Sequence, residues 1–283
     1  MTDEGHRVRE PSAGDPPQRA ATVTAPVGLI AGSGRLPILF AQAAARAGRR
    51  VIIVAHEGEA DPALPAQAWV KLGQLGRIVE VLRGAGVTEA VFCGGIKKPR
   101  LFDVRPDWLA LKALARMRSF GDDAALRAIA LALEEEGVRI VSPMPFVPEL
   151  VASLGPLGKR RLTDEQRADA AVGLAAARAL GAADIGQTVV VKRGVVLAVE
   201  AVEGTDTCIA RGGALGKGAI VVKARKPQQD DRFDAPAVGP RTVAALLAAG
   251  CSALAIEAGA ALVLDRAEMA AAADPAGLAV EGI

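Results

Sequence analysis

Histidine, cysteine and the aromatic residues are scarce in this chain, and each shortage argues against a class of function. The 283 residues include two histidines, three cysteines and no tyrosine. His6 lies in the N-terminal tail, which leaves His56 alone and argues against a histidine-based triad or a zinc site. The cysteines form neither a disulfide framework nor a metal-binding spacing, so we expect buried thiols in a reducing cytoplasm; they are Cys93, Cys208 and Cys251.

A charge excess and a long apolar run are also missing. The 34 basic and 32 acidic residues leave a net charge of +2. The chain lacks the clustered basic surface that nucleic acid requires, so we expect no nucleic-acid partner. No apolar run reaches the roughly 18–20 residues of a membrane-spanning helix. Residues 1–25 are rich in Pro, Gly, Arg and Asp and lack the apolar segment of a signal peptide, so we predict a disordered tail there.

The ordered part of the chain begins with alternating strands and helices. Residues 27–31 predict a strand that ends in glycine, residues 36–47 a helix and residues 51–54 a second strand, an order that implies a parallel sheet. The alternation continues with helices at 75–83, 109–117 and 122–136 and strands at 90–93 and 138–141. We therefore predict an α/β fold with a Rossmann-like parallel-sheet domain over residues 26–146, then a linker over residues 147–160.

The second half has a different pattern, which predicts an α+β catalytic domain over residues 161–283. Thr163 and Gln166 have the spacing of a capping box, which predicts a helix that runs to Leu180. Two valine-rich segments separated by Lys-Arg-Gly, at 188–191 and 195–202, predict a β-hairpin. Further strands are expected at 219–224, 253–256 and 262–264, and a helix at 242–249.

Two glycine motifs follow predicted strands of the first domain. Gly32, Ser33 and Gly34 stand between a strand and a helix, where backbone N–H groups can bind an anion. They do not form the dinucleotide fingerprint, because Pro37 replaces the third glycine, and a tight turn is the alternative. After the strand at 90–93, Gly95 allows close approach of a ligand. Two lysines next to it could neutralise phosphate or form a solvated surface loop; they are Lys97 and Lys98.

Two acidic motifs stand at the ends of predicted elements. Asp122 and Asp123 precede a helix, so they either cap it or bind a metal. Thr205 and Asp206 follow the strand at 195–202, where they form either a polar turn or part of a site. Arg211 lies five residues further on, so both charge signs are present, as recognition of a phosphate–metal complex requires.

The stretch from 226 to 239, called the charged loop below, carries the strongest signal for chemistry. It contains Lys226, Gln229, Asp230, Arg232 and Asp234, and prolines that stiffen the backbone near each end. Carboxylates are the oxygen ligands that Mg²⁺ prefers, usually alongside waters and substrate phosphates. The basic side chains could offset charge on a transferring phosphoryl group. A solvated polar loop is the alternative.

Together these motifs resemble, in order, those of the metal-dependent UDP-2,3-diacylglucosamine pyrophosphatases of lipid A biosynthesis, a family distinct from the calcineurin-like phosphoesterases. The resemblance extends from Val27 to the end of the chain. The matching segments are residues 28–37, 95–99, 121–123, 163–166, 184–187, 199–206, 226–234 and 257–259. The chain departs from the family pattern at Lys98, where arginine is expected, at Gln228, where glycine is usual, and at Ala235, where leucine is usual.

The resemblance implies Mg²⁺-dependent hydrolysis of the nucleotide sugar's phosphoanhydride to UMP and 2,3-diacylglucosamine 1-phosphate, called lipid X. The resemblance further implies that water attacks the phosphorus on the sugar side and that the substrate lies between the two domains. By the same resemblance, the essential aspartate is expected to be Asp230 or Asp234, and with Asp206 these are the expected metal ligands. Lys226 and Arg232 are expected to stabilise the transition state. The expected substrate-binding residues are Gly32, Ser33, Gly34, Gly95, Lys97, Lys98, Asp122, Asp123, Thr205 and Gln229.

Two other interpretations compete with this one. A nucleotide-sugar oxidoreductase or transferase would use the Rossmann-like half to bind a nicotinamide cofactor, which the broken glycine pattern argues against. A non-catalytic protein would bind the lipid-linked nucleotide sugar without turnover. If the substrate is diacylated, we expect a cytoplasmic enzyme with peripheral contact to the inner membrane, although no basic amphipathic helix stands out to mediate it.

Overall fold

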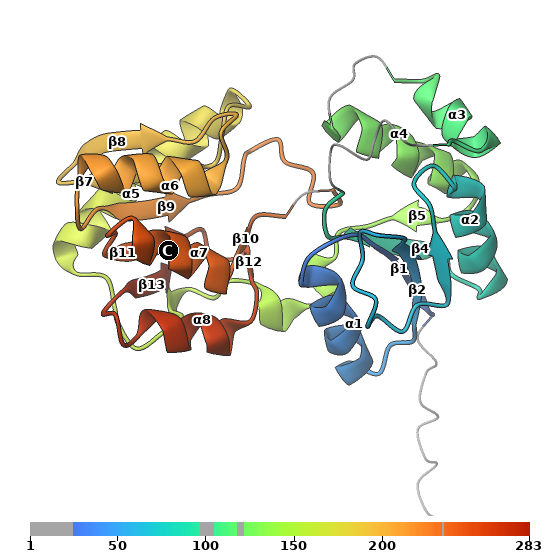
Figure 1. Ribbon diagram of the computed structural model, residues 1–283, viewed down its shortest axis with the longest axis horizontal. Coiled ribbons are helices and arrows are strands. Elements are labelled where there is room, and N and C mark those ends of the chain that lie inside the picture. The colour runs from blue at the N-terminus through green and yellow to red at the C-terminus, as the bar shows by residue number, and fades with distance from the viewer. Residues whose placement is uncertain (1–24, 97–104, 118–121, 234) are drawn as a thin grey trace, which may run out of the picture.

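The chain folds around two β-sheets, one in each half of the sequence (Figure 1). The computed structural model describes residues 25–96, 105–117, 122–233 and 235–283, and the account below concerns these residues. A five-stranded sheet belongs to the first half and a six-stranded sheet to the second, and a short two-stranded sheet lies between them in Figure 1. The predicted α/β class, with a parallel first sheet and a mixed second one, is confirmed.

The first sheet is parallel throughout, in the order β3-β2-β1-β4-β5. Its strands are β1 (Val27–Ala31), β2 (Val51–His56), β3 (Ala68–Val70), β4 (Glu89–Cys93) and β5 (Arg139–Ile140). Its helices are α1 (Leu36–Arg46), α2 (Leu75–Gly84), α3 (Trp108–Leu114) and α4 (Asp122–Glu135). One apolar cluster joins α1 to one sheet face and another joins the remaining three helices to the opposite face. Burial on both faces explains why the strands are apolar runs without alternation.

The second sheet is mixed, in the order β6-β13-β11-β9-β7-β8, with parallel pairing only among β9, β11 and β13. Its strands are β6 (Gly155–Pro156), β7 (Thr188–Lys192), β8 (Val195–Val199), β9 (Ile220–Lys223), β11 (Ala253–Ile256) and β13 (Ala279–Gly282). Helix α5 (Asp164–Ala182) packs on one face. The other face is covered by α6 (Thr205–Leu215), α7 (Pro240–Ala248) and α8 (Arg266–Ala273).

Two local predictions in the second half are confirmed by hydrogen bonds. The capping box forms, because the Gln166 amide donates to Thr163 Oγ1 at 3.2 Å and the Thr163 amide donates to Gln166 Oε1 at 2.9 Å. The predicted hairpin is the antiparallel pair β7 and β8. The start of α4 at Asp122 also agrees with the prediction.

Several elements were not predicted, and α6 shows why. Its sequence contains Gly212 and Gly213, which weaken a helix by about 1 kcal/mol each. A Cβ added at Gly212 would lie 2.5 Å from the Cβ of Val190, so tertiary packing requires glycine here. The prediction was also wrong in leaving out β3, α8 and β13. Strand β6 and two short 3-10 helices, Met144–Phe146 and Pro148–Leu150, lie in or beside the stretch predicted as a linker.

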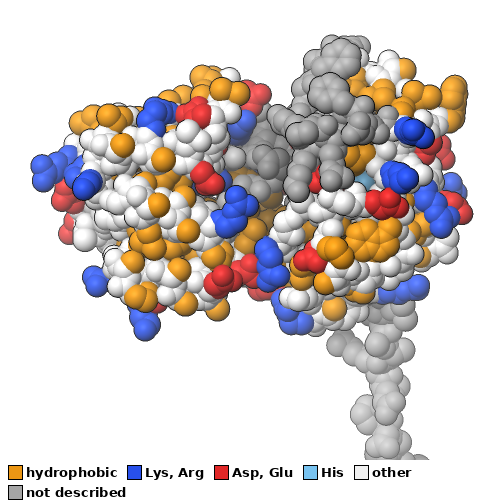
Figure 2. Space-filling model, viewed as in Figure 1, with side chains coloured by type: hydrophobic (Ala, Val, Ile, Leu, Met, Phe, Trp, Pro, Cys, Tyr) orange, Lys and Arg blue, Asp and Glu red, His pale blue; other side chains and the backbone are white. Residues whose placement is uncertain are grey.

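The two halves meet at the short parallel pair of β10 (Ala237–Val238) and β12 (Leu262–Val263). Side chains from this pair join the apolar cluster on the α1 side of the first sheet, together with Phe40 and Val147. Arg35 forms a bidentate ion pair with Asp265 at 2.9 and 3.0 Å across the same boundary. In Figure 2, acidic and basic side chains meet along this boundary. Within the described ranges, no helix is long and apolar enough to cross a membrane.

Candidate functional site

Two glycine loops cross at the edge where the strands of the first sheet end. The Ser33 amide donates to the Gly95 carbonyl at 2.8 Å, and the Gly95 amide donates to the Ser33 carbonyl at 3.1 Å. The Ser33 hydroxyl donates to the same Gly95 carbonyl at 2.8 Å. This crossing joins the ends of β1 and β4, where the strand order reverses and where open α/β sheets bind ligands. The structure therefore brings together Gly32, Ser33, Gly34 and Gly95.

Close backbone contact accounts for two glycines of this crossing. A Cβ at Gly32 would lie 2.5 Å from the Gly95 carbonyl oxygen. Gly94 has a φ of +86°, and its Cβ would lie 2.3 Å from the Ser33 carbonyl oxygen. A Cβ at Gly34, by contrast, would meet no atom within 4 Å, and only its φ of +94° favours glycine. Gly32 and Gly94 thus have a packing role in addition to any contact with a ligand. The amides of Ser33 and Gly95 already have backbone partners.

The second sheet presents its own polar edge. Strands β8 and β9 both run opposite to β7, so they end at the same edge, next to the start of α6 and the charged loop. There the Thr205 hydroxyl donates to the buried Glu200 carboxylate at 2.8 Å. Asp206, in the first turn of α6, is 63% exposed and lies 3.9 Å from Arg241. Thr205 is thus committed to a buried carboxylate, whereas Asp206 faces water.

The start of the charged loop is anchored to the end of α5. Lys226 Nζ contacts Asp184 at 2.8 Å, and the Gln228 side chain donates to the Gly181 carbonyl at 2.6 Å. Gln229 Oε1 accepts from the Lys226 amide at 3.2 Å, so this side chain closes a turn of the loop. These contacts fix the backbone at the start of the charged loop, and Lys226 is paired with Asp184.

Residues outside the predicted set complete this anchoring. Arg225 donates through its side chain to the Gln229 carbonyl at 2.9 Å, and its Nε lies 2.8 Å from Asp231. Glu257 accepts from the Arg225 amide at 2.9 Å and pairs with an arginine of α5. Lys223, buried at the end of β9, donates to the Ala237 carbonyl at 3.2 Å. The sequence signal for Lys223 was its position, because it is a charged residue at the end of an apolar strand.

Asp230 lies at the centre of a charged cluster that both halves of the chain supply. Arg232 binds it through two bonds, Nε to Oδ1 at 2.9 Å and a terminal nitrogen to Oδ2 at 2.8 Å. Arg127, from α4 of the first half, donates to Oδ2 at 3.1 Å. Arg232 also contacts Glu134 of α4 at 3.2 Å. The hydrogen bond from Arg232 holds the pKa of the Asp230 carboxyl below its usual range, so Asp230 is ionised at neutral pH.

Phe233 connects this cluster to the first sheet. Its ring lies 4.8 Å from the Arg232 guanidinium carbon and 5.6 Å from that of Arg127, as in cation–π pairs. The ring also packs against Phe92 of β4, with centroids 6.2 Å apart. Phe92 stands two residues before Gly94, so the charged cluster approaches the strand end that carries the glycine crossing.

Neither Arg127 nor Phe233 was predicted as a site residue. Arg127 lies in the segment predicted as a helix, four positions after the predicted site residue Asp123, and this spacing was the signal available for it. Phe233 lies between Arg232 and Asp234 inside the charged loop. Three predicted site residues, Lys97, Lys98 and Asp234, lie outside the described residues, as do the side chains of Asp122 and Asp123.

The described residues do not form a ready-made metal site. Among them, no three His, Cys, Asp or Glu side chains gather where they could hold an ion. Asp230, Asp231 and Glu257 each pair with an arginine. This donor set fits Mg²⁺ only as an ion that keeps its waters and binds one or two carboxylates together with substrate phosphates. The three cysteines are free and buried, as predicted, and burial raises the pKa values of Cys208 and Cys251 to about 11.

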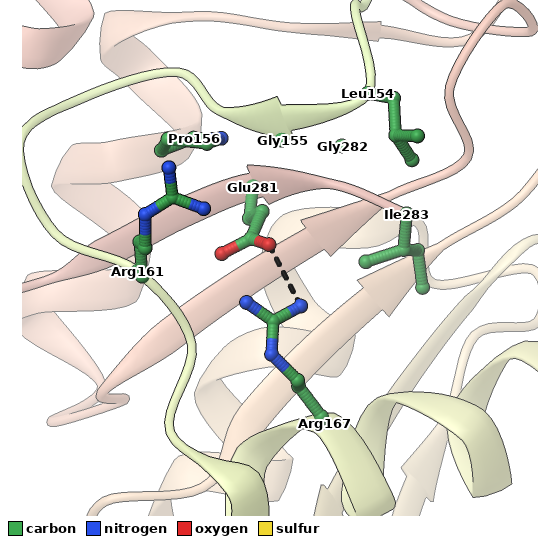
Figure 3. A pocket seen from close by; sticks show the side chains of 8 residues that line it. All are labelled: Leu154, Gly155, Pro156, Arg161, Arg167, Glu281, Gly282 and Ile283. Atoms are coloured by element: carbon green, nitrogen blue, oxygen red, sulfur yellow. Dashed lines mark ion pairs between the residues drawn. The ribbon is translucent and has the colours of Figure 1, made fainter.

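A separate pocket of about 500 Å³ lies at the β6–β13 edge of the second sheet (Figure 3). The buried Glu281 carboxylate pairs there with Arg167 at 2.8 Å and accepts from the Leu162 amide at 2.8 Å. Arg161 lies beside Pro156 in the same view. The pocket shares no residue with the charged loop, and it contains no predicted site residue.

Comparison with known proteins agrees with the two-part architecture and with the resemblance drawn from the motifs. Residues 26–150 match the family model of the LpxI N-terminal domain, and residues 153–281 match that of the LpxI C-terminal domain. The chain is 37% identical over 271 residues to the UDP-2,3-diacylglucosamine pyrophosphatase LpxI of Caulobacter vibrioides, which covers 91% of this chain and 97% of that relative. The chain therefore belongs to the LpxI family.

Proposed function

We propose that this protein hydrolyses the pyrophosphate bond of UDP-2,3-diacylglucosamine in lipid A biosynthesis and releases UMP and lipid X. The observation that carries the proposal is the Asp230 cluster, in which two arginines from different halves of the chain meet one carboxylate. Such a cluster suits a substrate with two linked phosphates, because guanidinium groups bind phosphate and carboxylate in the same forked geometry. The LpxI relative bears the name of this activity.

The reaction replaces one P–O bond by another. A water oxygen bonds to the phosphorus on the sugar side, and the bond from that phosphorus to the bridging oxygen breaks. UMP leaves with the bridging oxygen and the electron pair of that bond, and the two protons of the water pass to the phosphate products or to solvent. Negative charge on the phosphoryl oxygens must be stabilised throughout, and Arg232 and Lys226 are the basic groups that we assign to this task. Asp230 has a lowered pKa and is a weak base, so it suits the role of an anionic ligand better than that of proton acceptor.

We also propose that the reaction requires Mg²⁺. Asp230, Asp234 and Asp206 are the carboxylates that we assign to the ion. Bound there, it would supply positive charge next to the phosphoryl oxygens. The pairing of Asp230 with Arg232 implies that the carboxylate must exchange partners before it can take this role. The substrate-binding roles of Gly34, Gly95, Lys97, Lys98, Asp122 and Asp123 remain part of the same proposal.

The test is incubation of the purified protein with UDP-2,3-diacylglucosamine in H₂¹⁸O, with Mg²⁺ or with EDTA, followed by mass spectrometry of both products. We expect UMP and lipid X in the Mg²⁺ sample, ¹⁸O in the lipid X phosphate, and no products with EDTA. Label in UMP would contradict attack at the sugar-side phosphorus. Binding of the substrate without any product would support a non-catalytic binding protein, and turnover only with a nicotinamide cofactor would support an oxidoreductase.

For the place of action, we propose the cytoplasm, with peripheral contact to the inner membrane. An exposed apolar face on α3 supports the contact, since Trp108 is 80% exposed, Leu111 47% and Leu114 48%. Figure 2 shows hydrophobic side chains gathered at the upper right, where Figure 1 places α3. Trp and Leu on one helix face suit the boundary between head groups and acyl chains. Flotation with phosphatidylethanolamine–phosphatidylglycerol vesicles tests the contact, which Trp108→Ala should weaken.

A further inference from the structure

The two guanidinium groups at Asp230 converge on a single oxygen. Arg127 reaches Asp230 Oδ2 at 3.1 Å from the first half of the chain, and Arg232 reaches the same Oδ2 at 2.8 Å from the charged loop. The Phe233 ring lies near both guanidinium groups and limits where they can move. Asp230 itself is only 17% exposed at its side chain. A negatively charged oxygen thus sits between two cations that belong to different halves of the molecule.

This arrangement is what a phosphoryl oxygen of the substrate would require. A carboxylate and a phosphate present oxygens of the same charge and similar spacing to a guanidinium fork. If phosphate replaces the carboxylate, both arginines keep an anionic partner, and neither is left unpaired during the exchange. The exchange also frees Asp230, which the proposed reaction needs for its own role.

Stability alone does not explain why Arg127 is there. Its side chain is 43% exposed, and ion pairs at that exposure contribute about 1 kcal/mol or less. The halves are already joined by the apolar cluster around β12 and by the bidentate pair of Arg35 with Asp265. Partial exposure also leaves Arg127 accessible to a ligand.

We propose that Arg127 is a substrate-binding residue, which holds a phosphate of the diphosphate against Arg232, and that Asp230 occupies this phosphate position until the substrate displaces it. This inference rests on the proposed function and adds to it the contribution of the first half. Arg127 supplies a cation from α4, so a bound diphosphate connects both halves of the chain through one group.

The first measurement compares turnover of Arg127→Gln with that of the wild type. We expect kcat/KM to fall about 100-fold, because one charge-assisted contact to the reacting group is lost. Arg127→Lys should retain more activity, since it keeps the charge but not the fork. Arg139→Gln is the matched control, because it removes one positive charge from an exposed ion pair of the same half and should leave turnover near the wild-type rate. Circular dichroism and thermal unfolding of each variant establish that it is folded.

The second measurement is calorimetric binding of UDP in EDTA, which does not depend on catalysis. Arg127→Gln should bind UDP about 10-fold more weakly than the wild type. Asp230→Asn should bind UDP several-fold more tightly, because the competing carboxylate is gone. Glu89→Gln, which removes a carboxylate from an exposed ion pair of the first half, should bind as the wild type does. A purely structural Arg127 would not produce tighter binding in Asp230→Asn.

The outcomes separate this inference from the proposed function. If the wild type cleaves the substrate but Arg127→Gln cleaves it and binds UDP equally well, the role of Arg127 is wrong and the function stands. If Asp230→Asn binds UDP no more tightly, the displacement is wrong. If the wild type cleaves nothing, the proposed function fails, and the UDP affinities still decide whether Arg127 binds phosphate. A wild type that neither cleaves nor binds overturns both.

Discussion

The two sheets differ in the contacts that hold the loops at their functional edges. At the end of β1 and β4, two loops meet through backbone atoms, with Ser33 and Gly95 exchanging hydrogen bonds and Gly32 packed against a carbonyl. At the end of β9, the charged loop is held mainly by side chains, including the bidentate pair of Asp230 and Arg232. A backbone crossing leaves no room for a larger residue, whereas ion pairs can exchange partners. The first edge is therefore a fixed frame, and the second is where we place the chemistry.

This contrast makes opposite demands on mutations. Changes at the glycine crossing should lower the free energy of unfolding, because an added atom meets backbone that cannot move aside. Changes at the charged cluster should lower turnover with little effect on folding, since its members remain partly in contact with water. Four predictions test the contrast.

The largest effect is expected for Asp230→Asn. The substitution keeps the shape of the side chain but removes the anionic ligand that we assign to the reaction, so turnover should fall on the order of 1,000-fold. Release of UMP measures it. Asp231→Asn is the matched control, because Asp231 is the neighbouring carboxylate and pairs with Arg225 in the loop anchoring. Equal losses in both variants would mean that the effect is one of loop structure.

At the other edge, Gly32→Ala should affect folding far more than any loop substitution. Its Cβ would lie 2.5 Å from the Gly95 carbonyl oxygen, so the crossing must open, at a cost of about 2–3 kcal/mol. Urea unfolding measures the loss. Gly34→Ala is the control, since nothing lies within 4 Å of its Cβ and only the positive φ costs about 1–2 kcal/mol. If Gly34→Ala cost more than Gly32→Ala, close approach would not be the reason for glycine at the crossing.

The pH dependence of stability should also separate the two edges. The pKa of Asp230 is lowered in the folded protein, chiefly by its hydrogen bond from Arg232. The contribution of this pair is therefore complete above the ordinary aspartate pKa of about 3.9 and is lost as the pH falls through the lower folded value. The unfolding free energies of wild type and Arg232→Gln should differ by at most about 1 kcal/mol at pH 7 and converge in acid. The loss of unfolding free energy caused by Gly32→Ala should not change with pH. If the losses caused by Arg232→Gln and by Gly32→Ala both declined in acid, the pH dependence could not be assigned to the Asp230–Arg232 pair.

The smallest effect is expected at the cysteine thiols, to which we assign no role at either functional edge. Cys93 ends β4, but its side chain is buried in the apolar cluster on the α1 side of the first sheet. Cys93, Cys208 and Cys251 are buried, and burial raises the pKa of each thiol. At pH 8 the thiols are protonated and should not react with iodoacetamide while the protein is folded, and turnover should be unchanged. Mass spectrometry after alkylation in native buffer and in urea makes the comparison. Rapid labelling in native buffer together with loss of activity would mean that a thiol is accessible at the site.

Much of the fold was predictable because local signals and tertiary structure agree. Apolar runs at β1, β2 and β4 predict buried parallel strands, and the capping box at Thr163 forms as its spacing indicates. Prediction failed where tertiary contacts override local preference. Helix α6 keeps two glycines because they pack against Val190 and Ala249. Strands β6 and β13 form through long-range pairing, β6 with β13 and β13 with β11, which no local pattern indicates.

For the candidate site, the sequence identified residues of the charged loop but not the residues from the first half that contact them. Asp230, Arg232 and Lys226 stood out because charges and prolines cluster in one short loop. Arg127 did not stand out, because it lies on a helix 103 positions before Asp230 in the sequence. Hydrogen bonding at that distance in sequence depends on how the two sheets pack, which no local pattern reports.

By itself, the sequence determined the family, the α/β class and the loop that carries the acidic and basic groups. These follow from local patterns, since strand periodicity, glycine turns and ordered motifs can each be recognised within a few residues. Only the tertiary structure decided that Gly32 is a packing residue, that Asp230 is neutralised by two arginines and that one of these comes from the other half of the chain. The physical reason is that burial and charge pairing depend on distances through space, and the fold sets those distances by bringing two sheet edges together.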